Sequence, residues 1–544
     1  MIGKNMFINF SEIPGNNNLF LDFMYEFEKV EHFYKLNFRD EESYANVFKS
    51  ISEKEISNNK KIVDIIDSQY KSHSPSEKTI ENITLLKQKK TIAILTGQQL
   101  GLVGGPLYTV YKIFTAIKLC EYLKTKFTDF NFVPIFWLAG DDHDIEEISE
   151  LKFVSKNNIL NTIKYSDSEK ETKHSVGNLQ IDSSIENFYA EIKQSVRETE
   201  FSKELYNILD GVLTKDKTIV QSFHSLIFRI FDETGLIIFN PQDKEVKKLL
   251  KPIFTKELKD YHQHSASVLS VSANLDENYH TQVKVKPINL FMSDKTGRHL
   301  IEPTDNGFRL KGRRTKFSKE EMLKFVDEQP ENFSANVLLR PICQDYLFPT
   351  GFYIAGPGEI SYFAQAITLY KHFNVQQPFI YPRSSATIVE GNISKVLVKN
   401  NLSIKEMFLG TDELNSKVIH NILEENVETI FGKFTKSIDK NLSSLSNQLS
   451  IIDRSLEDVS NNSKSKIIHQ IEILKSKAKK IEENKYEVAL RQLDKARNNL
   501  YPNGNLQERE LSIINFINKY GMDFFDWLYN ELEIGEFEHQ ILEL

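Results

Sequence analysis

The sequence has little cysteine and no long apolar run, and each absence excludes a class of protein. Cys120 and Cys343 are its only cysteines, too few for a disulfide framework or a zinc-binding pattern, so we expect no structural zinc. No stretch approaches the roughly 18 apolar residues of a membrane-spanning helix. The first residues, MIGKNMFINFSEIPG, lack the basic and apolar segments of a signal peptide. We therefore expect a cytoplasmic protein that does not associate with membranes.

Positive charge is not in excess either. The formal net charge is −8, with 68 Lys and Arg against 76 Asp and Glu. This balance argues against a nucleic-acid-binding surface, and we expect no nucleic-acid partner, whereas a few well-placed cations could bind a small anion. The length of 544 residues exceeds that of one compact core and predicts two or three domains.

Residues 91–144 carry the clearest pattern. The segment TIAILTGQQLGLVGGPLYTVYK predicts a strand, a glycine-rich loop and a helix, and FVPIFWLAGDDHDIEEI predicts a second strand that ends in an acidic loop. Two such strand ends are typical of the ligand-binding crevice of a doubly wound α/β sheet. The glycines match neither the GxGxxG nor the Walker pattern, and a turn needed only for packing is the alternative. The candidate substrate-binding residues here are Gly97, Gln98, Gln99, Tyr108 and Lys112.

The acidic loop at 141–144 crowds three carboxylates and one imidazole. Carboxylates this close repel one another unless a ligand, an ion or a function compensates. His143 beside these acids should favour its protonated form, which suits donating a proton near neutral pH. We assign Asp141 to substrate binding and Asp142, His143 and Asp144 to catalysis. A metal site and a helix N-cap are the alternatives, but a recognised ligand spacing is missing and we expect no metal.

A second strand, glycine turn and helix are predicted around residues 352–365. Gly356 and Gly358 precede or begin the helix and are candidate substrate-binding residues. Glu359 lies in the first helical turn, where it either stabilises the helix N-terminus or binds an amine.

Further polar residues flank this second crossover. Arg340 and Asp345 precede the strand, where they form either a structural ion pair or part of the binding site. Arg383, Ser384 and Ser385 follow the next short strand, Phe379–Pro382, and offer a cation and two hydroxyls to a phosphate or carboxylate. All five are candidate substrate-binding residues, with a structural role as the alternative for each.

Two polar excursions interrupt the apolar pattern. Residues 156–217 are rich in Ser, Asn, Lys and Glu and predict an irregular insertion. Residues 258–335 predict a second insertion, with small antiparallel strands at Gln282–Val285 and Phe308–Leu310. Asp305-Asn306-Gly307 predicts a hairpin turn between strands.

Residues 415–500 predict a coiled-coil arm. Apolar residues recur at alternating intervals of four and three, and a polar break at Ser460–Ser463 predicts the turn of an antiparallel helical hairpin. The predicted seam contains Ile438, Leu442, Leu445, Leu449, Ile452, Leu456 and Val459, then Ile467, Ile471, Leu474, Ala478 and Ile481. An arm of this length cannot bury its outer face alone, so we expect a homodimer formed through it; an arm folded onto its own domain is the alternative.

Five segments together resemble the bacillithiol biosynthesis cysteine-adding enzyme family. They are TGQQLGLVGGPLYTVYK, PIFWLAGDDHDIEEI, RPICQDYLFPTGFYIAGPGEISYFAQ, YPRSSATIVE and YPNGNLQER, in the family's order and over nearly the whole chain. The resemblance implies an α/β, Rossmann-like core of the nucleotidylyltransferase type, with two inserted connecting-peptide segments and an antiparallel coiled-coil arm that dimerises. Together with the patterns above it divides the chain into core segments at 1–155, 218–257 and 336–414, insertions at 156–217 and 258–335, an arm at 415–500 and a C-terminal docking segment at 501–544.

The implied reaction is an amide-forming ligation that joins the carboxyl of cysteine to the amine of glucosaminyl malate. A free carboxylate must be activated first, and the core resembles that of class I aminoacyl-tRNA synthetases. An ATP-derived cysteinyl adenylate is therefore one route, and ATP or ADP is the candidate cofactor. Neither HIGH nor KMSKS occurs in the sequence, so an acyl phosphate or a cysteine delivered already activated stays open.

Charge and placement suggest a role for each group in this reaction. The acidic loop would move protons at the amine or the leaving group, Lys112 and Arg383 would hold malate or phosphate oxygens, and Asp345 or Glu359 would bind an ammonium. A polar cluster after the arm suggests a second nucleotide or effector site formed by Asn503, Gly504, Gln507 and Arg509. The competing interpretations are another ATP-dependent ligase or nucleotidylyltransferase acting on an amino sugar or amino acid, and a non-enzymatic coiled-coil scaffold.

Overall fold

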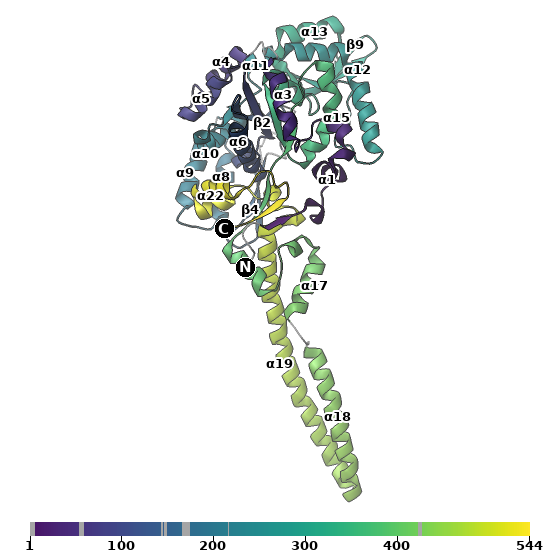
Figure 1. The fold of residues 1–544 in the computed structure, drawn as a ribbon. Coiled ribbons are helices and arrows are strands. Elements are labelled where there is room, and N and C mark those ends of the chain that lie inside the picture. Colours follow the sequence, from purple (N-terminus) through teal and green to yellow (C-terminus); the bar gives the residue numbers. More distant parts are fainter. Residues whose placement is uncertain are drawn as a thin grey trace. The chain divides into compact units, whose positions relative to one another are not determined.

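The computed structural model describes residues 6–53, 59–142, 145, 149–165, 174–215, 217–422 and 427–544. They divide into two compact units (Figure 1). The first unit comprises the chain up to Thr387 together with Leu506–Leu542, and the second comprises Ile388–Asn505 with Glu543–Leu544. Among the helices in these described ranges, none combines the length and the apolar character that crossing a bilayer requires.

A five-stranded parallel sheet lies at the centre of the first unit. Its order is β13–β12–β2–β3–β6, and every neighbouring pair is parallel. The strands are β2 (Thr91–Gln99), β3 (Asn131–Ala139), β6 (Ile237–Phe239), β12 (Thr350–Ala355) and β13 (Phe379–Pro382). They are mostly buried apolar runs, as expected for a parallel sheet covered on both faces. The chain proceeds from β2 outward to β6 and then returns to the other side of β2, so the strand order reverses between β2 and β12. The predicted doubly wound, Rossmann-like core is confirmed.

Close pairing of β2 with β3 depends on Gly97. A Cβ atom on Gly97 would lie only 2.8 Å from the carbonyl oxygen of Trp137 on the neighbouring strand. Helix α6 (Tyr108–Lys126) follows β2 and packs on β2 and β3, and α15 (Pro357–Phe373) follows β12 and packs on β12 and β13. Further helices of this unit are α1 (Asn18–Tyr25), α2 (Glu31–Tyr34), α3 (Glu41–Glu53), α4 (Asn59–Gln69), α5 (Glu77–Leu85), α10 (Ile219–Phe231), α11 (Lys244–Leu249) and α14 (Arg340–Leu347).

The first polar excursion is more regular than its composition predicts. Within it, β5 (Leu160–Lys164) pairs antiparallel with β4 (Glu150–Val154), which lies just before the predicted boundary, and helices α8 (Ile185–Ser195) and α9 (Ser202–Val212) follow. Both helices bury an apolar face, which in α8 includes Phe188. The prediction of an irregular segment was wrong because the abundant polar residues occupy the outer helix faces.

The second excursion contains a five-stranded antiparallel sheet of order β10–β9–β8–β7–β11. Its elements are α12 (Lys251–Asp276), β7 (Leu290–Asp294), β8 (Gly297–Thr304), β9 (Gly307–Leu310), β10 (Lys316–Ser318), α13 (Lys319–Glu328) and β11 (Phe333–Ala335). The predicted hairpin is confirmed, because Thr304 pairs with Gly307 across the turn. The predicted strand at Gln282–Val285 is wrong. Both backbone groups of Val283 bond instead to the buried side chain of Gln365, so no neighbouring strand is needed. Helix α12 also runs through the expected boundary at 257/258.

The chain after the arm returns to the first unit. It forms α20 (Gln507–Glu510), α21 (Ile514–Tyr520), α22 (Asp523–Glu531) and β15 (His539–Glu543). Strand β15 pairs antiparallel with β1 (Met6–Ile8), and Leu511 accepts a backbone hydrogen bond from Leu107 beside the glycine-rich loop. Residues that follow the arm therefore reach the edge of the crevice.

The second unit consists mainly of helices. They are α16 (Gly391–Lys399), α17 (Thr411–Ile422), α18 (Val427–Ile452) and α19 (Ser455–Leu500), which follow β14 (Ser385–Val389). Helices α18 and α19 lie side by side as an antiparallel hairpin (Figure 1). The hairpin is as predicted, but its turn lies at Asp453-Arg454 rather than at Ser460–Ser463. The carboxylate of Asp453 accepts hydrogen bonds from the backbone and hydroxyl of Ser455, which starts α19 there.

Candidate active site

A cavity of about 380 Å³ lies where the strand order reverses, at the carboxyl ends of β2 and β12. A doubly wound sheet offers this position to ligands. Its lining residues are Gly97, Gln98, Gln99, Tyr108, Lys112, Gln282, Val283, Val337, Arg340, Gly356, Pro357, Gly358, Glu359, Tyr362, Arg383 and Arg509. The sequence therefore located the crevice, and the structure brings most of its predicted substrate-binding residues together.

Two smaller cavities adjoin this main cavity. One of about 230 Å³ follows the glycine-rich loop and shares Gln98, Gln99, Tyr108 and Arg509 with it. Another, of about 110 Å³, lies toward the acidic loop and shares Gln99, Val337 and Arg340. The site is thus a main cavity with two extensions that meet near Gln99, and we call the 110 Å³ extension the inner pocket.

The glycine-rich loop needs its glycines for its own geometry. Gly104 and Gly105 have positive φ values of 84° and 69°, and a Cβ atom on Gly101 would lie 2.8 Å from the Cα of Gly105. A non-glycine residue at these positions would strain the backbone or collide with it. Packing therefore explains these glycines, while the same bare backbone forms the wall of the 230 Å³ cavity.

Lys112 and Glu359 form a buried ion pair across the reversal point. The Lys112 ammonium also donates to the carbonyl of Gly97 at 2.9 Å and to the Gln98 side chain at 3.0 Å. Burial lowers the pKa of Lys112, and the charge of Glu359 opposes that effect. The pair joins the helix after β2 to the helix after β12.

Glu359 remains ionised in this environment. Burial alone would raise its pKa, but Lys112 and a hydrogen bond from the Gly356 backbone hold the pKa below its ordinary value. Its carboxylate accepts from Gly356 at 2.8 Å and from the Tyr353 hydroxyl at 2.9 Å. Glu359 thus caps α15, as the structural alternative predicted, and also lines the cavity; its role toward an ammonium stays a prediction.

Arg340 stands where the main cavity meets the inner pocket. Its guanidinium donates to the Tyr362 hydroxyl, whereas its Nε is buried and has no hydrogen-bond partner within the described part of the chain. Asp345 accepts instead from Tyr370 at 2.7 Å, so different tyrosines of α15 hold the two residues. Burial raises the pKa of Asp345 to about 7, which disfavours the permanent charge that an ion pair or an ammonium site needs.

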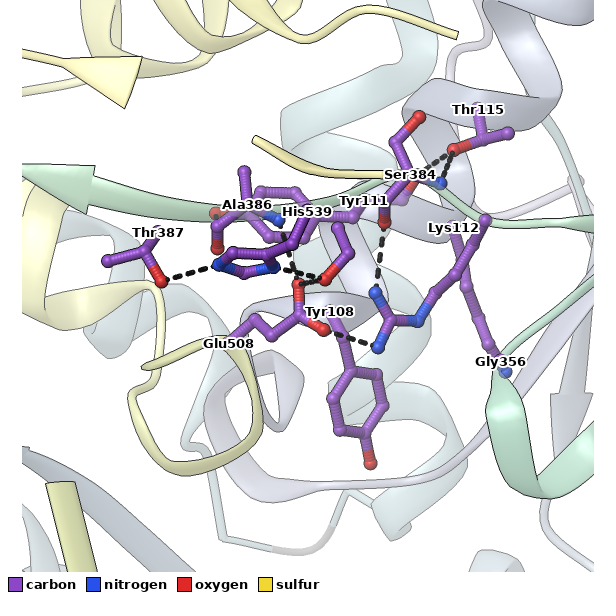
Figure 2. A network of polar contacts seen from close by, with 12 residues as sticks. Tyr108, Tyr111, Lys112, Thr115, Gly356, Ser384, Ala386, Thr387, Glu508 and His539 are labelled. Atoms are coloured by element: carbon purple, nitrogen blue, oxygen red, sulfur yellow. Dashed lines mark hydrogen bonds and ion pairs between the residues drawn. The ribbon is translucent and has the colours of Figure 1, made fainter. Parts of the chain in front are cut away.

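Arg383 is held by a buried network that the sequence did not predict (Figure 2). Its guanidinium bonds the carboxylate of Glu508 at 2.5 Å and the carbonyl of Ser384 at 2.9 Å, and it lies over the ring of Tyr108. Burial alone would raise the pKa of Glu508, but the Arg383 charge keeps it below its usual range. One face of Arg383 still lines the main cavity.

The two serines after Arg383 bond to protein groups. Ser384 donates through its backbone to Thr115 and through its hydroxyl to the carbonyl of Glu533. The Ser385 hydroxyl bonds both Glu508, at 3.0 Å, and His539, at 2.8 Å. Neither serine is among the residues that line the three cavities. The contacts of both serines therefore agree with a structural role, which was the alternative to substrate binding.

The negative charge of the acidic loop is balanced in part by cations of the protein itself. Asp141 pairs with the buried Lys247 at 2.8 Å, and Asp142 lies 3.5 Å from the buried Arg298 and accepts from Gln99 at 3.1 Å. Both carboxylates line the inner pocket. His143 and Asp144, the other predicted catalytic residues, lie outside the described residues. No cluster of three or more metal-ligating side chains occurs in the ranges that the structure does describe.

The predicted second site after the arm crosses the boundary between the two units. Asn503 and Gly504 belong to the second unit, whereas Gln507 and Arg509 belong to the first. Gln507 is buried, and Arg509 lines both the main cavity and the 230 Å³ cavity. Arg509 therefore joins the cations of the crevice, and a separate effector site stays a prediction.

Sequence reasoning missed several residues that shape the site, among them Lys247, Arg298, Tyr362 and Glu508. Of these four, only Tyr362 and Glu508 lie inside the distinctive segments quoted above, where their presence was a usable signal. Lys247 and Arg298 come from a helix and a strand whose local sequences resemble ordinary solvated surface. Their roles depend on tertiary contacts with the acidic loop.

Comparison with known proteins agrees with this architecture. Residues 6–384 match the model described as "Bacillithiol biosynthesis BshC, N-terminal Rossmann-like domain", and residues 386–544 match "Bacillithiol biosynthesis BshC, C-terminal coiled-coil domain". A relative from Salinibacter ruber is 32% identical over 96% of both chains, and one from Chloroherpeton thalassium is 34% identical over 86% of this chain and 85% of its own. Both relatives carry the name "Putative cysteine ligase BshC". The chain belongs to the bacillithiol biosynthesis BshC family.

Proposed function

We propose that this protein is a ligase that joins the carboxyl of cysteine to the amine of glucosaminyl malate. The observation that carries the proposal is the concentration of cations around the main cavity, where Lys112, Arg340, Arg383 and Arg509 face a single described carboxylate, Glu359. Arginines hold carboxylates through charge-assisted, often bidentate hydrogen bonds, which suits the two carboxyl groups of a malyl substrate. The names of the relatives supply cysteine as the other substrate.

The 230 Å³ cavity is the part of the site that suits a nucleotide. The side-chain-free wall at Gly101 and Gly105 allows close approach, and Arg509 supplies positive charge. Lys152 also lines this cavity but is paired with Glu150 and Glu510. ATP bound there would supply the activation that a free carboxylate lacks, with pyrophosphate as the leaving group. The protein's own residues would hold the phosphates and exclude water from the activated carboxyl. A cysteine-dependent exchange of labelled pyrophosphate into ATP tests this route, and absence of exchange would contradict it.

Amide formation also requires removal of a proton from the attacking amine. Asp142 lies close to the junction of the cavities through its bond to Gln99, and we assign it, with His143 and Asp144, to this proton transfer. Glu359 would orient the amine as its ammonium form before transfer. These assignments follow from charge and position in the crevice.

Metabolite analysis tests the overall function. Cells that lack this protein should lose bacillithiol and accumulate glucosaminyl malate, and the wild-type gene should restore the thiol. A His143→Asn variant that is present at wild-type amounts should fail to restore it. Restoration by this variant would remove His143 from the mechanism, and an unchanged thiol level without the protein would contradict the proposed function.

We also propose that the arm forms a homodimer and that the protein acts in the cytoplasm. Large apolar side chains on α18 and α19 are strongly exposed in the single chain, including Ile452 at 76% and Ile481 at 60%. A second copy of the chain would cover them. Two free, buried cysteines, Cys120 and Cys343, support a reducing compartment.

A further inference from the structure

The inner pocket has lining residues of two kinds. Apolar side chains, among them Trp137, Leu250 and Phe254, line it together with charged side chains of both signs. The charged lining residues are Asp141, Asp142, Lys247, Arg298 and Arg340. Its volume is about 110 Å³, against about 380 Å³ for the main cavity. A small zwitterion with a short apolar side chain fits a pocket of this size and chemistry, because it carries one charge of each sign and little else to accommodate.

Arg340 is oriented to receive a carboxylate at the mouth of this pocket. It lines both the inner pocket and the main cavity, and its Nε donor is buried without a partner within the described residues. An unpaired buried donor costs free energy that an incoming acceptor would recover. Its neighbour Tyr362 holds the other end of the guanidinium, so the orientation is fixed before a ligand arrives.

Asp141 can receive an ammonium although it already has a protein partner. A carboxylate offers about four lone-pair positions, and the contact with Lys247 uses only some of them. The side chains of Asp141 and Asp142 also remain partly exposed, at 26% and 43%. Lys247 and Arg298 hold the two carboxylates in place at the pocket wall.

We propose that the inner pocket binds the amino-acid substrate, with its α-ammonium at Asp141, its carboxylate at Arg340 and its thiol side chain against Trp137. This assignment rests on the proposed cysteine ligase function. It places the reacting carboxyl at the junction with the main cavity, where the amine of the second substrate would lie. The amine nitrogen of the second substrate would form the new C–N bond at that junction while the bond from the acyl carbon to the AMP oxygen breaks. AMP would leave toward the glycine-rich loop, and the amine proton would pass to the acidic loop.

Cys343 on the pocket wall is compatible with a thiol substrate. Burial raises the pKa of its thiol to about 12, so it stays protonated. A protonated thiol is a poor nucleophile and does not exchange readily with a neighbouring sulfur. The pocket can therefore hold substrate cysteine beside a protein cysteine without forming a mixed disulfide.

Side chains that fill each cavity separately test the assignment. Ala139 and Ala335 lie in different strands and both line the inner pocket, so Ala139→Leu and Ala335→Leu are the two test variants. Gly358→Leu is the matched control in the main cavity, because a Cβ atom on Gly358 meets nothing within 4 Å and its helix accepts a side chain. Calorimetric titration under reducing conditions would measure binding of L-cysteine and of glucosaminyl malate to each protein, with thermal unfolding to confirm that it is folded.

We expect both alanine variants to weaken L-cysteine binding by about tenfold to a hundredfold, the usual cost of overfilling a packed site, and to change glucosaminyl malate binding by less than about twofold. Gly358→Leu should weaken glucosaminyl malate binding and change L-cysteine binding by less than about twofold. Unchanged cysteine binding in both folded alanine variants would overturn the pocket assignment and leave the ligase function standing. A wild-type protein that binds neither substrate, with or without ATP, would overturn the proposed function itself and this inference with it.

Discussion

Two buried ion pairs border the same cavity, and they differ in what surrounds them. Lys112–Glu359 joins two helices that directly follow neighbouring strands, and the Glu359 side chain keeps 17% of its surface exposed at the cavity. Arg383–Glu508 joins residues 125 positions apart in the sequence, and Glu508 is fully enclosed. The first pair is open to a ligand on one side, whereas the second is sealed by protein groups. The open pair is therefore suited to respond to substrate, and the sealed pair to hold Arg383 in position.

The sealed pair should give the largest loss of stability when it is broken. Glu508→Gln keeps the shape of the side chain but leaves the Arg383 charge buried without a counter-charge. Removing one partner of a buried pair costs about 3–5 kcal/mol in the free energy of unfolding. Chemical denaturation of the full-length protein would measure this loss.

A double variant separates charge from packing at this position. Arg383→Met with Glu508→Leu removes both charges and should recover much of the lost stability, since apolar replacements of buried pairs are often neutral. It should still bind glucosaminyl malate poorly, because Arg383 lines the cavity. Equal stability of Glu508→Gln and wild type would show that the pair does not hold the fold.

His539 makes the sealed network sensitive to pH. Burial lowers its pKa to about 4, with Glu508 raising it and Arg383 lowering it further, so the folded protein resists protonation that the unfolded chain accepts near pH 6.5. The contribution of His539 to the free energy of unfolding is complete above pH 6.5 and falls as the pH drops toward 4. The difference amounts to about 3 kcal/mol.

Unfolding measured between pH 7 and pH 4 tests this dependence. His539→Gln should lose less stability over that range than the wild type, although it starts from a lower value at pH 7 because its bonds to Ser385 and Thr387 are altered. His224, whose pKa burial lowers to about 3, titrates in the same direction and leaves a residual slope. Parallel pH profiles for variant and wild type would rule out His539 as the source.

The open pair should matter less for stability and more for binding. Lys112→Met leaves Glu359 with its bonds from Gly356 and Tyr353, so we expect a loss of about 1–3 kcal/mol. The pKa of Glu359 is lower in the folded protein than in the unfolded chain. This carboxylate therefore stabilises the fold at pH values above its unfolded pKa and loses that contribution as the pH falls. Lys112→Met should make the stability depend less on pH in this acidic range. Ligase activity should fall about 100-fold or more. Lys112→Arg is the control that keeps the charge, and wild-type activity in Lys112→Met would contradict a role for the open pair.

The same contrast explains what the sequence could predict. Both members of the open pair lie in strand, glycine turn and helix segments, whose local pattern predicts the elements and their meeting at the reversal point. The position of Arg383 directly after a strand made it a candidate site residue. Glu508 could not be predicted in the same way, because its contact with Arg383 depends on how the chain returns after the arm. The hairpin turn at Asp453 was missed for a related reason. Heptad spacing continues through it to Leu456 and Val459, whereas the break is marked by the hydrogen bonds from Ser455 to the Asp453 carboxylate.

The arm should give the smallest effect on folding of all these changes. Leu474 and Ile481 lie on α19 with 59% and 60% of their surfaces exposed, so folding of a single chain does not bury them. Leu474→Glu and Ile481→Glu should change the free energy of unfolding by less than about 0.5 kcal/mol per site in the monomer. If the arm dimerises through this face, the same two variants should halve the mass measured by light scattering.

Ile471→Glu is the matched control on the same helix, because Ile471 is buried within the hairpin and its substitution should unfold the arm rather than merely separate two copies. A wild-type protein that is already monomeric, or a Leu474→Glu variant that keeps the dimer mass, would contradict dimerisation through this face.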